Sequence, residues 1–325
     1  MAVFLLLDGA DPVYVFSNML SGSFGSKLAI SETIVKTIPL LLCALAVALP
    51  AKAGLINIGA EGQLYAGAIG ASFIALFLPW MPDLFMLPAM FIGAIILGMI
   101  WAFIPGFLKA TLNVNEIIIT LLLNYVAIFW VQYLVHGPWK DPSSQGWPLT
   151  PKFPESAILP TIPGTRIHLM LLTGLILVFS LYFLLSRTTW GFSLRIIESN
   201  SNAARYAGIN ISVYVIVIFC IGGALAGLSG LGEVSAIQGR LRDGISPGYG
   251  YTGFLVSWLA RNNFLAIPFV ALFMGAILSG GDNLQIFANL PAATVDVLQG
   301  ILLLGVLFNE YWGKRDQFII QKEVA

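Results

Sequence analysis

Charged residues are scarce in this sequence. Asp, Glu, Lys and Arg together make up 10% of its 325 residues, and hydrophobic residues make up 58%, whereas a typical soluble domain is about 25% charged. The mean hydropathy is +0.88. A chain this apolar would aggregate in water, so the composition predicts an integral membrane protein in contact with lipid. The 16 basic residues balance the 16 acidic ones, which gives no electrostatic case for binding nucleic acid.

Cysteine and histidine are also scarce. Cys43 and Cys220 lie inside apolar runs, where free thiols behave as small hydrophobic groups, and two cysteines indicate no disulfide framework. His136 and His168 have no cysteine or carboxylate nearby at ligand spacing. We therefore expect no metal site and no cofactor.

The common catalytic motifs are absent. The sequence has no G-x-x-x-x-G-K-[S/T], so the chain cannot hold ATP in a P-loop of its own. It also lacks H-E-x-x-H and G-x-S-x-G, the patterns of zinc proteases and serine hydrolases. The G-x-G-x-x-G at Gly248–Gly253 follows no strand pattern, which argues against a dinucleotide site. We therefore expect a protein that is not an enzyme.

Long apolar runs are what the sequence has in abundance. They cover residues 33–51, 64–79, 84–108, 117–135, 167–186, 212–231, 264–280 and 294–309. Most approach the ~20 residues that a transmembrane helix needs. The pattern predicts an all-α fold, a polytopic transmembrane helical bundle forming a single domain over residues 1–325 with about 8–9 spans.

The connections between these runs carry further expectations. Met1–Leu7 is apolar but too short to span, so we expect the truncated tail end of a first span. Asp8–Glu32 is polar and rich in Gly and Ser, which predicts a surface connection. His136–Thr165 is rich in proline and predicts an irregular loop, and Glu233–Gly244 predicts a charged loop.

Gly54–Gln63, with the sequence GLINIGAEGQ, interrupts two membrane runs. Glycine, amide and carboxyl side chains at this position predict an unwound backbone whose polar groups the bundle must satisfy. The alternative is a plain turn in which Asn57 or Glu61 caps the next helix. Ser246–Ala260, with three glycines, predicts a second broken helix and suggests an internal repeat.

Polar residues within other runs point to the bundle interior. Asn124 lies in mid-span, where an amide is costly unless it finds a partner. Asn113 and Glu116 have the spacing of a capping box with asparagine as the cap. Gly223 and Gly227 form a G-x-x-x-G, which allows two helices to approach closely.

Trp190–Ile211 is the longest polar interruption in the second half of the chain. A polar segment of helix length cannot lie in lipid, so it predicts one surface helix and a turn. Gly191 would break the incoming span, and Gly208 would end the helix in a left-handed conformation. The alternative is an ordinary loop that joins two spans.

Three stretches resemble the permeases of ABC importers of the branched-chain amino acid, ribose and nucleoside group. They are G-L-x-N-I-G-x-E-G-Q at Gly54–Gln63, N-E-I-I-x-T-L-x-x-N-Y at Asn115–Tyr125, and G-x-x-L-R followed by N-x-x-A-A-x-x-A-G-I within Gly191–Ile209. The resemblance is closest to permeases of purine-nucleoside, guanosine-type importers. The chain departs from the family at residues 196–198, where the family usually has small residues.

The resemblance implies roles for particular residues. Residues 190–211 would form a cytoplasmic coupling helix that enters a cleft of an ATP-hydrolysing subunit. The residues expected to couple the two subunits are Arg195, Glu198, Asn200, Ala203, Ala204 and Gly208. Those expected to line the substrate pathway are Asn57, Glu61, Gln63 and Asn124, with Tyr65 and Tyr125 as stacking neighbours. A competing interpretation is that Asn57 and Glu61 only hold the broken backbone together.

The implied machine has two permease chains, two copies of the ATP-binding subunit and one extracytoplasmic solute-binding lipoprotein, in a bacterial cytoplasmic membrane. It would move a nucleoside by alternating access, driven by the separate ATPase. A permease for a simple sugar or another small solute is the nearest alternative. An ion-coupled secondary transporter, with Asp296 linked to protons, is an alternative of a different class, and an uncoupled channel is a third.

Overall fold

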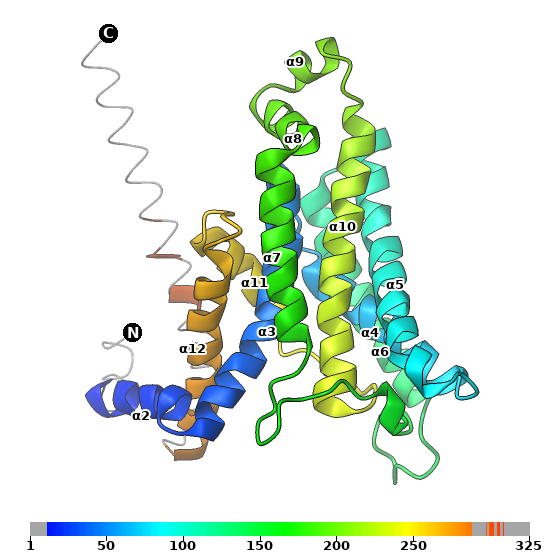
Figure 1. Ribbon diagram of the computed structural model, residues 1–325, viewed down its shortest axis with the longest axis vertical. Coiled ribbons are helices and arrows are strands. Elements are labelled where there is room, and N and C mark those ends of the chain that lie inside the picture. The colour runs from blue at the N-terminus through cyan, green and yellow to red at the C-terminus, as the bar shows by residue number, and fades with distance from the viewer. Residues whose placement is uncertain (1–11, 288–296, 298, 302–303, 306–307, 309–325) are drawn as a thin grey trace. The chain divides into compact units, whose positions relative to one another are not determined.

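The computed structural model describes residues 12–287, 297, 299–301, 304–305 and 308, and its regular elements are helices (Figure 1). The chain forms two compact parts. The larger part is Ile34–Met274, and the smaller part combines Met1–Thr33 with Gly275–Ala325. Met1–Leu7 and Asp296 lie outside the described residues, as does most of the predicted run 294–309.

The larger part contains most of the helices. They are α3 (Lys27–Ala51, which begins in the smaller part), α4 (Ala60–Phe77), α5 (Asp83–Leu112), α6 (Glu116–His136), α7 (Met170–Arg187), α8 (Thr189–Ser199), α9 (Ser201–Tyr206), α10 (Ile211–Gly232), α11 (Tyr249–Leu259) and the first turns of α12 (Ile267–Phe287). Among the described residues, α3, α5, α6, α7 and α10 are long and apolar enough to cross a membrane. The fold is therefore an all-α polytopic helical bundle.

Burial separates an inner helix from outer ones. In the most apolar stretch of α3, 83% of the residues are buried, against 28% in α5, in α6 and in α7. An apolar helix surface that the protein leaves uncovered is suited to lipid. We infer that α5, α6 and α7 each present a broad face to the hydrocarbon.

Glycines bring α4, α5 and α10 into close contact, and α5 and α10 run side by side (Figure 1). A Cβ atom at Gly223 would clash with the backbone oxygen of Gly98, and one at Gly67 would clash with the backbone of Gly227. The predicted G-x-x-x-G contact on α10 is thus confirmed. Small residues allow backbones to approach where lipid supplies no hydrophobic driving force.

The predicted surface connection at Asp8–Glu32 is helical in its described residues, most of which are exposed. Here α2 spans Pro12–Phe24, and α3 begins at Lys27. Ser23 Oγ donates to the backbone oxygen of Met19 within α2 at 2.8 Å, and Ser26 Oγ, just before α3, accepts from the backbone N–H of Ala29 at 3.0 Å. Hydroxyl groups that bond to nearby backbone let a polar stretch remain helical.

The predicted capping box is wrong. The cap of α6 is Asn115, whose side chain accepts from the backbone N–H of Ile117 at 2.9 Å. Asn113 instead ends α5 in a left-handed conformation, with φ of 50°, which asparagine tolerates. Glu116 makes an ion pair with Lys109 at 3.0 Å, so its contact reaches back to α5.

The connections around α10 differ from expectation in one place. The irregular loop predicted at His136–Thr165 is present from Gly137, after α6 ends, and contains one 3₁₀ turn at Glu155–Ala157. Glu233–Gln238, however, continues α10 as a π-helix instead of beginning a loop. The loop covers it, because Ser235 Oγ donates to the backbone oxygen of Ala157 and accepts from the backbone N–H of Leu159.

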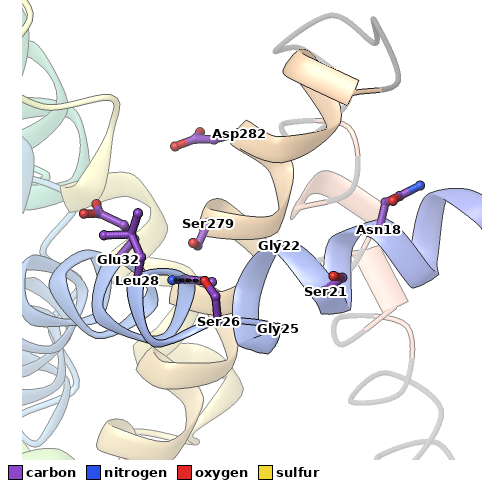
Figure 2. A pocket seen from close by; sticks show the side chains of 10 residues that line it. Asn18, Ser21, Gly22, Gly25, Ser26, Leu28, Glu32, Ser279 and Asp282 are labelled. Carbon is purple, nitrogen blue, oxygen red and sulfur yellow. Dashed lines mark hydrogen bonds between the residues drawn. The ribbon is translucent and has the colours of Figure 1, made fainter.

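The smaller part is formed by α2, the start of α3 and the later turns of α12. Ser23 Oγ lies 2.6 Å from the backbone oxygen of Ala276, and Thr33 Oγ1 donates to the backbone oxygen of Ser23 at 2.9 Å. A hollow of about 490 Å³ lies among these segments. Figure 2 shows Glu32, Ser279 and Asp282 around it.

Candidate functional site

The break between α3 and α4 forms the polar centre of the larger part. Residues 52–59 are not helical, and Gly54 has φ of +72°, a conformation that favours glycine. Asn57 is fully buried within this break. The unwound segment predicted at Gly54–Gln63 is therefore confirmed up to Gly59, and α4 begins at Ala60.

Two buried amides bond to each other at the start of α4. Asn57 Nδ2 donates to Gln63 Oε1, and Gln63 Nε2 donates to Asn57 Oδ1, each at 3.2 Å. Asn57 Oδ1 also accepts from the backbone N–H of Gly59 at 2.9 Å, and Asn57 Nδ2 lies 3.3 Å from the backbone oxygen of Ala46 on α3. The amides thereby satisfy backbone groups that the break leaves without helical partners.

Helix α6 supplies further hydrogen-bond partners for the backbone at this break. Asn124 Oδ1 accepts from the backbone N–H of Gly62 at 2.8 Å, and Asn124 Nδ2 donates to the backbone oxygen of Ile58 at 2.9 Å. Thr120 Oγ1 accepts from the backbone N–H of Ile58 at 3.3 Å. The first N–H groups of a helix have no partner within it, and here Asn124 satisfies one of them. The prediction that Asn124 faces the bundle interior is confirmed.

Glu61 connects the break before α4 to the start of α11, in the segment predicted to be a second broken helix. Its Oε2 accepts from the backbone N–H of Gly250, in the first turn of α11, at 2.6 Å. Ser246 and the backbone of Gly248 also lie within bonding reach of the carboxyl group. Gly248, with φ of +93°, directly precedes α11, and a Cβ atom at Gly250 would clash with the backbone of Glu61. The predicted second broken helix is thus confirmed, and its start contacts the start of α4.

The carboxyl group of Glu61 therefore lies at the N-terminal ends of two helices, α4 and α11. It belongs to the first turn of α4 and bonds to the first turn of α11. A helix N-terminus carries a partial positive charge and unpaired N–H donors, which attract an acceptor. The side chain is 2% exposed, so these contacts take the place of water.

The structure brings together four of the six residues predicted for the pathway. Asn57, Gln63 and Asn124 are at most 1% exposed and, with Glu61, surround the start of α4. Tyr65, at 3% exposed, follows on the same helix, whereas Tyr125 is 52% exposed on α6. In this conformation Asn57 and Gln63 bond to each other, whereas Glu61 and Asn124 bond to backbone groups. Their part in a pathway stays a prediction.

Sequence reasoning missed Thr120, Ser246 and Gly250 at this centre. Thr120 lies one helical turn before Asn124, so the same face of α6 carries both, and that spacing was a usable signal. Ser246 Oγ accepts from the backbone N–H groups of Gly248 and Tyr249 at 3.1 and 2.9 Å. The contact of Gly250 with Glu61 joins residues 189 positions apart, which no local pattern predicts.

Trp190–Ile211 forms two helices instead of the expected one. Asn200 ends α8 and caps α9, and its side chain accepts from the backbone N–H groups of Asn202 and Ala203 at 3.0 and 3.1 Å. Gly208 follows α9 with φ of +77°, as predicted. The prediction for Gly191 is wrong, because the chain turns at Thr188 and Gly191 lies within α8. A Cβ atom there would clash with the backbone of Leu185.

The predicted coupling residues divide into anchoring and exposed groups. Arg195 Nη1 donates to the backbone oxygen of Leu185 at 2.8 Å and so fastens α8 to the end of α7. Ala204 is fully buried. Besides Arg195, which is itself exposed, the exposed members are Glu198, Asn200, Ala203 and Gly208.

The most exposed large side chain of this segment was not among the predicted residues. Tyr206, at the end of α9, is 94% exposed, and Phe192 on α8 is 58% exposed. An aromatic residue within a polar loop was the available signal, since exposed aromatic groups are enriched at protein interfaces. Together with the four exposed polar or small residues, they form the outer face of α8 and α9.

The two histidines do not form a site together. His136 Nδ1 lies 2.9 Å from the backbone oxygen of Gln132, whereas His168 is 3% exposed. Burial, helped by Arg166, lowers the pKa of His168 to about 4, so this imidazole is neutral at physiological pH. The described residues contain no group of three or more His, Cys, Asp and Glu side chains placed to hold a metal ion.

Three features together define a class of protein: helices able to span a membrane, two broken helices whose starts meet in the interior, and a largely exposed helical segment between two spans. They are the features of an integral membrane transporter. The chain belongs to the family of permease components of branched-chain amino acid transport systems, whose pattern it matches over residues 29–307. It is thus a permease subunit, a multi-pass protein of the cell membrane.

Relatives of known activity cover most of the chain. The glucose ABC transporter permease of Haloferax volcanii is 35% identical over 95% of this chain and 84% of its own length. The guanosine ABC transporter permease of Bacillus subtilis is 31% identical over 94% and 88%. The nucleoside ABC transporter permease of Lactococcus lactis is 29% identical over 87% and 80%.

Proposed function

We propose that this chain is a permease subunit of an ABC importer and moves an uncharged polar solute, a nucleoside, across the cell membrane by alternating access. The observation that carries the choice of an uncharged solute is the contact between Glu61 and Gly250. In transporters with broken helices, helix N-termini commonly face an anionic group of the substrate. Here a carboxyl group of the protein itself occupies the point between the two N-termini.

The position of the Glu61 carboxyl group also bears on branched-chain amino acids, the substrates after which the family is named. The carboxylate of an amino acid would have to displace Glu61 from Gly250 to reach either N-terminus. A nucleoside or a sugar has no such group, and buried amides such as those of Asn57, Gln63 and Asn124 are suited to its hydroxyl and ring groups. The geometry therefore favours an uncharged solute over an amino acid.

Nucleoside and sugar are the two candidates within this class. Two relatives, at 31% and 29% identity, are permeases for guanosine and for nucleosides, and the motif at Gly54–Gln63 resembles the nucleoside branch. The relative at 35% identity is a glucose permease, which makes a simple sugar the second candidate.

Partners follow from the same proposal. Two copies of an ATP-binding subunit would hydrolyse ATP, and the outer face of α8 and α9 would dock on one of them. A second permease chain would complete the membrane pathway, and an extracytoplasmic lipoprotein would deliver the solute. An ion-coupled secondary transporter is the alternative from another class.

The choice of substrate is tested by uptake into proteoliposomes that hold the complete transporter with its binding protein. We expect radiolabelled guanosine to enter at least tenfold faster than radiolabelled leucine, because a carboxylate has no free helix terminus to meet. Glucose serves as the comparison within the uncharged class. Faster uptake of glucose would shift the assignment to a sugar, and fastest uptake of leucine would contradict the proposal.

The pathway is tested by single cysteines in a background with Cys43→Ala and Cys220→Ala. We expect Asn57→Cys, Gln63→Cys and Asn124→Cys to react with a small hydrophilic thiol reagent at rates that change several-fold between the ATP-bound and ATP-free transporter. Alternating access must wet the cavity in one state. Mass spectrometry of the labelled chain measures the rate.

Ser72→Cys is the matched control, since Ser72 is fully buried on α4, three turns beyond Ala60. It should stay protected in both states. Equal protection of all four cysteines, with transport intact, would assign the amides a structural role only.

A further inference from the structure

A second hollow, of about 430 Å³, lies within the larger part where α7 meets α8. Three segments that are distant in the sequence line it. Lys52 comes from the break after α3, Arg195 from α8, and the turn Arg261–Phe264 from the connection between α11 and α12. We name this hollow the basic pocket.

The basic pocket has an excess of positive charge. Lys52, Arg195 and Arg261 are its basic residues, and Glu198 is its one carboxylate. Within the described chain, no carboxylate lies within ion-pair distance of these three basic groups. Basic side chains that gather without a counter-ion raise the local potential and attract an anion.

Contacts that leave donors available hold the side chains of Arg195 and Lys52, and an unusual backbone conformation positions Arg261. Arg195 uses Nη1 on the backbone oxygen of Leu185, which leaves its other N–H groups for a ligand. Lys52 Nζ lies 6.0 Å from the centre of the Phe264 ring. Arg261 and Asn262 are consecutive residues with left-handed backbones, at φ of 51° and 54°, a costly arrangement that tends to occur at functional sites.

The position of the basic pocket indicates where its anion comes from. Leu172, Ile176, Phe179 and Phe183 repeat at helical spacing on α7 and are each at least 55% exposed, which makes a continuous apolar stripe. The stripe leads to the pocket, because Tyr182 of the same helix lines it and is 45% exposed. A ligand with an acyl chain and an anionic headgroup fits both surfaces at once.

We propose that the basic pocket binds the phosphate of an anionic phospholipid, with an acyl chain along the apolar stripe of α7. Basic pockets between transmembrane helices at the membrane surface suit such headgroups. A bound phosphate would link α8, through Arg195, to Lys52 and Arg261 on two other segments. The lipid would thereby hold the α8–α9 segment, and anionic lipid would favour transport.

The test compares lipids retained by the purified full chain in native mass spectrometry. Phosphatidylglycerol and phosphatidylcholine are offered in equal amounts, with inorganic phosphate added in excess in a parallel sample. We expect phosphatidylglycerol to be retained preferentially and unaffected by inorganic phosphate. The double variant Lys52→Gln/Arg261→Gln should lower its retention by about tenfold or more, since each basic group near a membrane surface contributes to anionic lipid binding.

Arg187→Gln is the matched control, because Arg187 ends α7, is exposed, and does not line the pocket. Its lipid retention should equal that of the unaltered chain. Size-exclusion elution shows that each variant is folded. Equal retention by the double variant, or no preference for phosphatidylglycerol, overturns the proposal. Displacement of the lipid by inorganic phosphate overturns it in favour of a site for soluble anions.

Discussion

Replacing Tyr206 by alanine is expected to lower ATP-driven uptake by more than tenfold without unfolding the permease. Tyr206 is 94% exposed at the end of α9, so its ring adds nothing to the folded core. The segment beneath it is held by the bond between Arg195 and Leu185 and by the buried side chain of Ala204. Exposed tyrosines on a fixed support are typical interface hot spots. Truncating a hot spot to alanine costs about 2 kcal/mol or more of binding free energy.

Tyr133→Ala is the matched control. Tyr133 is also a highly exposed tyrosine, at 67%, but it belongs to α6 and not to the α8–α9 segment. The measurement is uptake by the reconstituted transporter together with copurification of the ATPase on a tagged permease. If Tyr206→Ala retains as much ATPase and uptake as Tyr133→Ala, the α8–α9 segment is not the docking surface.

Replacing Glu61 by alanine is expected to destabilise the permease by about 3 kcal/mol. The change leaves the backbone N–H of Gly250 without its acceptor in a buried position, and each such loss costs about 1–3 kcal/mol. It also leaves a void between the starts of α4 and α11. A lower midpoint of thermal unfolding, measured by fluorescence-detected size exclusion, is the expected result.

Glu61→Gln separates this structural contact from any role of the carboxyl group in transport. The glutamine oxygen can still accept from Gly250, so Glu61→Gln should lose less than half the stability that Glu61→Ala loses. If Glu61→Ala is as stable as the unaltered chain, the contact between the starts of α4 and α11 does not depend on Glu61. Normal stability with lost uptake in Glu61→Gln would add a direct role in the pathway.

Features carried by local sequence patterns were predictable. Gly54–Gln63 combines glycines with amide and carboxyl groups between apolar runs, and the structure unwinds there as predicted. Gly223 and Gly227 recur at the spacing of one helix face and do form a close helix contact. Hydropathy located α5, α6, α7 and α10 to within a few residues, because a helix in lipid must satisfy its backbone internally.

Features that depend on partners distant in the sequence were not predictable. Glu233–Gln238 carries a charge and was expected to be a loop, but residues 157–159 cover it. Asn113 and Asn115 are both suited to cap a helix, and only the path of the chain after α5 decides between them. Likewise, Glu61 was identified from its motif, whereas its bond to Gly250 comes from the packing of α4 against α11.

The measurement that tests the central claim most directly is uptake by the purified transporter in proteoliposomes with the energy source controlled. The account predicts that uptake of guanosine requires the ATPase subunit and enclosed ATP, and that it persists when ionophores collapse the proton and sodium gradients. It also predicts no uptake by the permease chain alone under an imposed gradient. Gradient-driven uptake by this chain alone, without an ATPase, would contradict the assignment as an ABC permease.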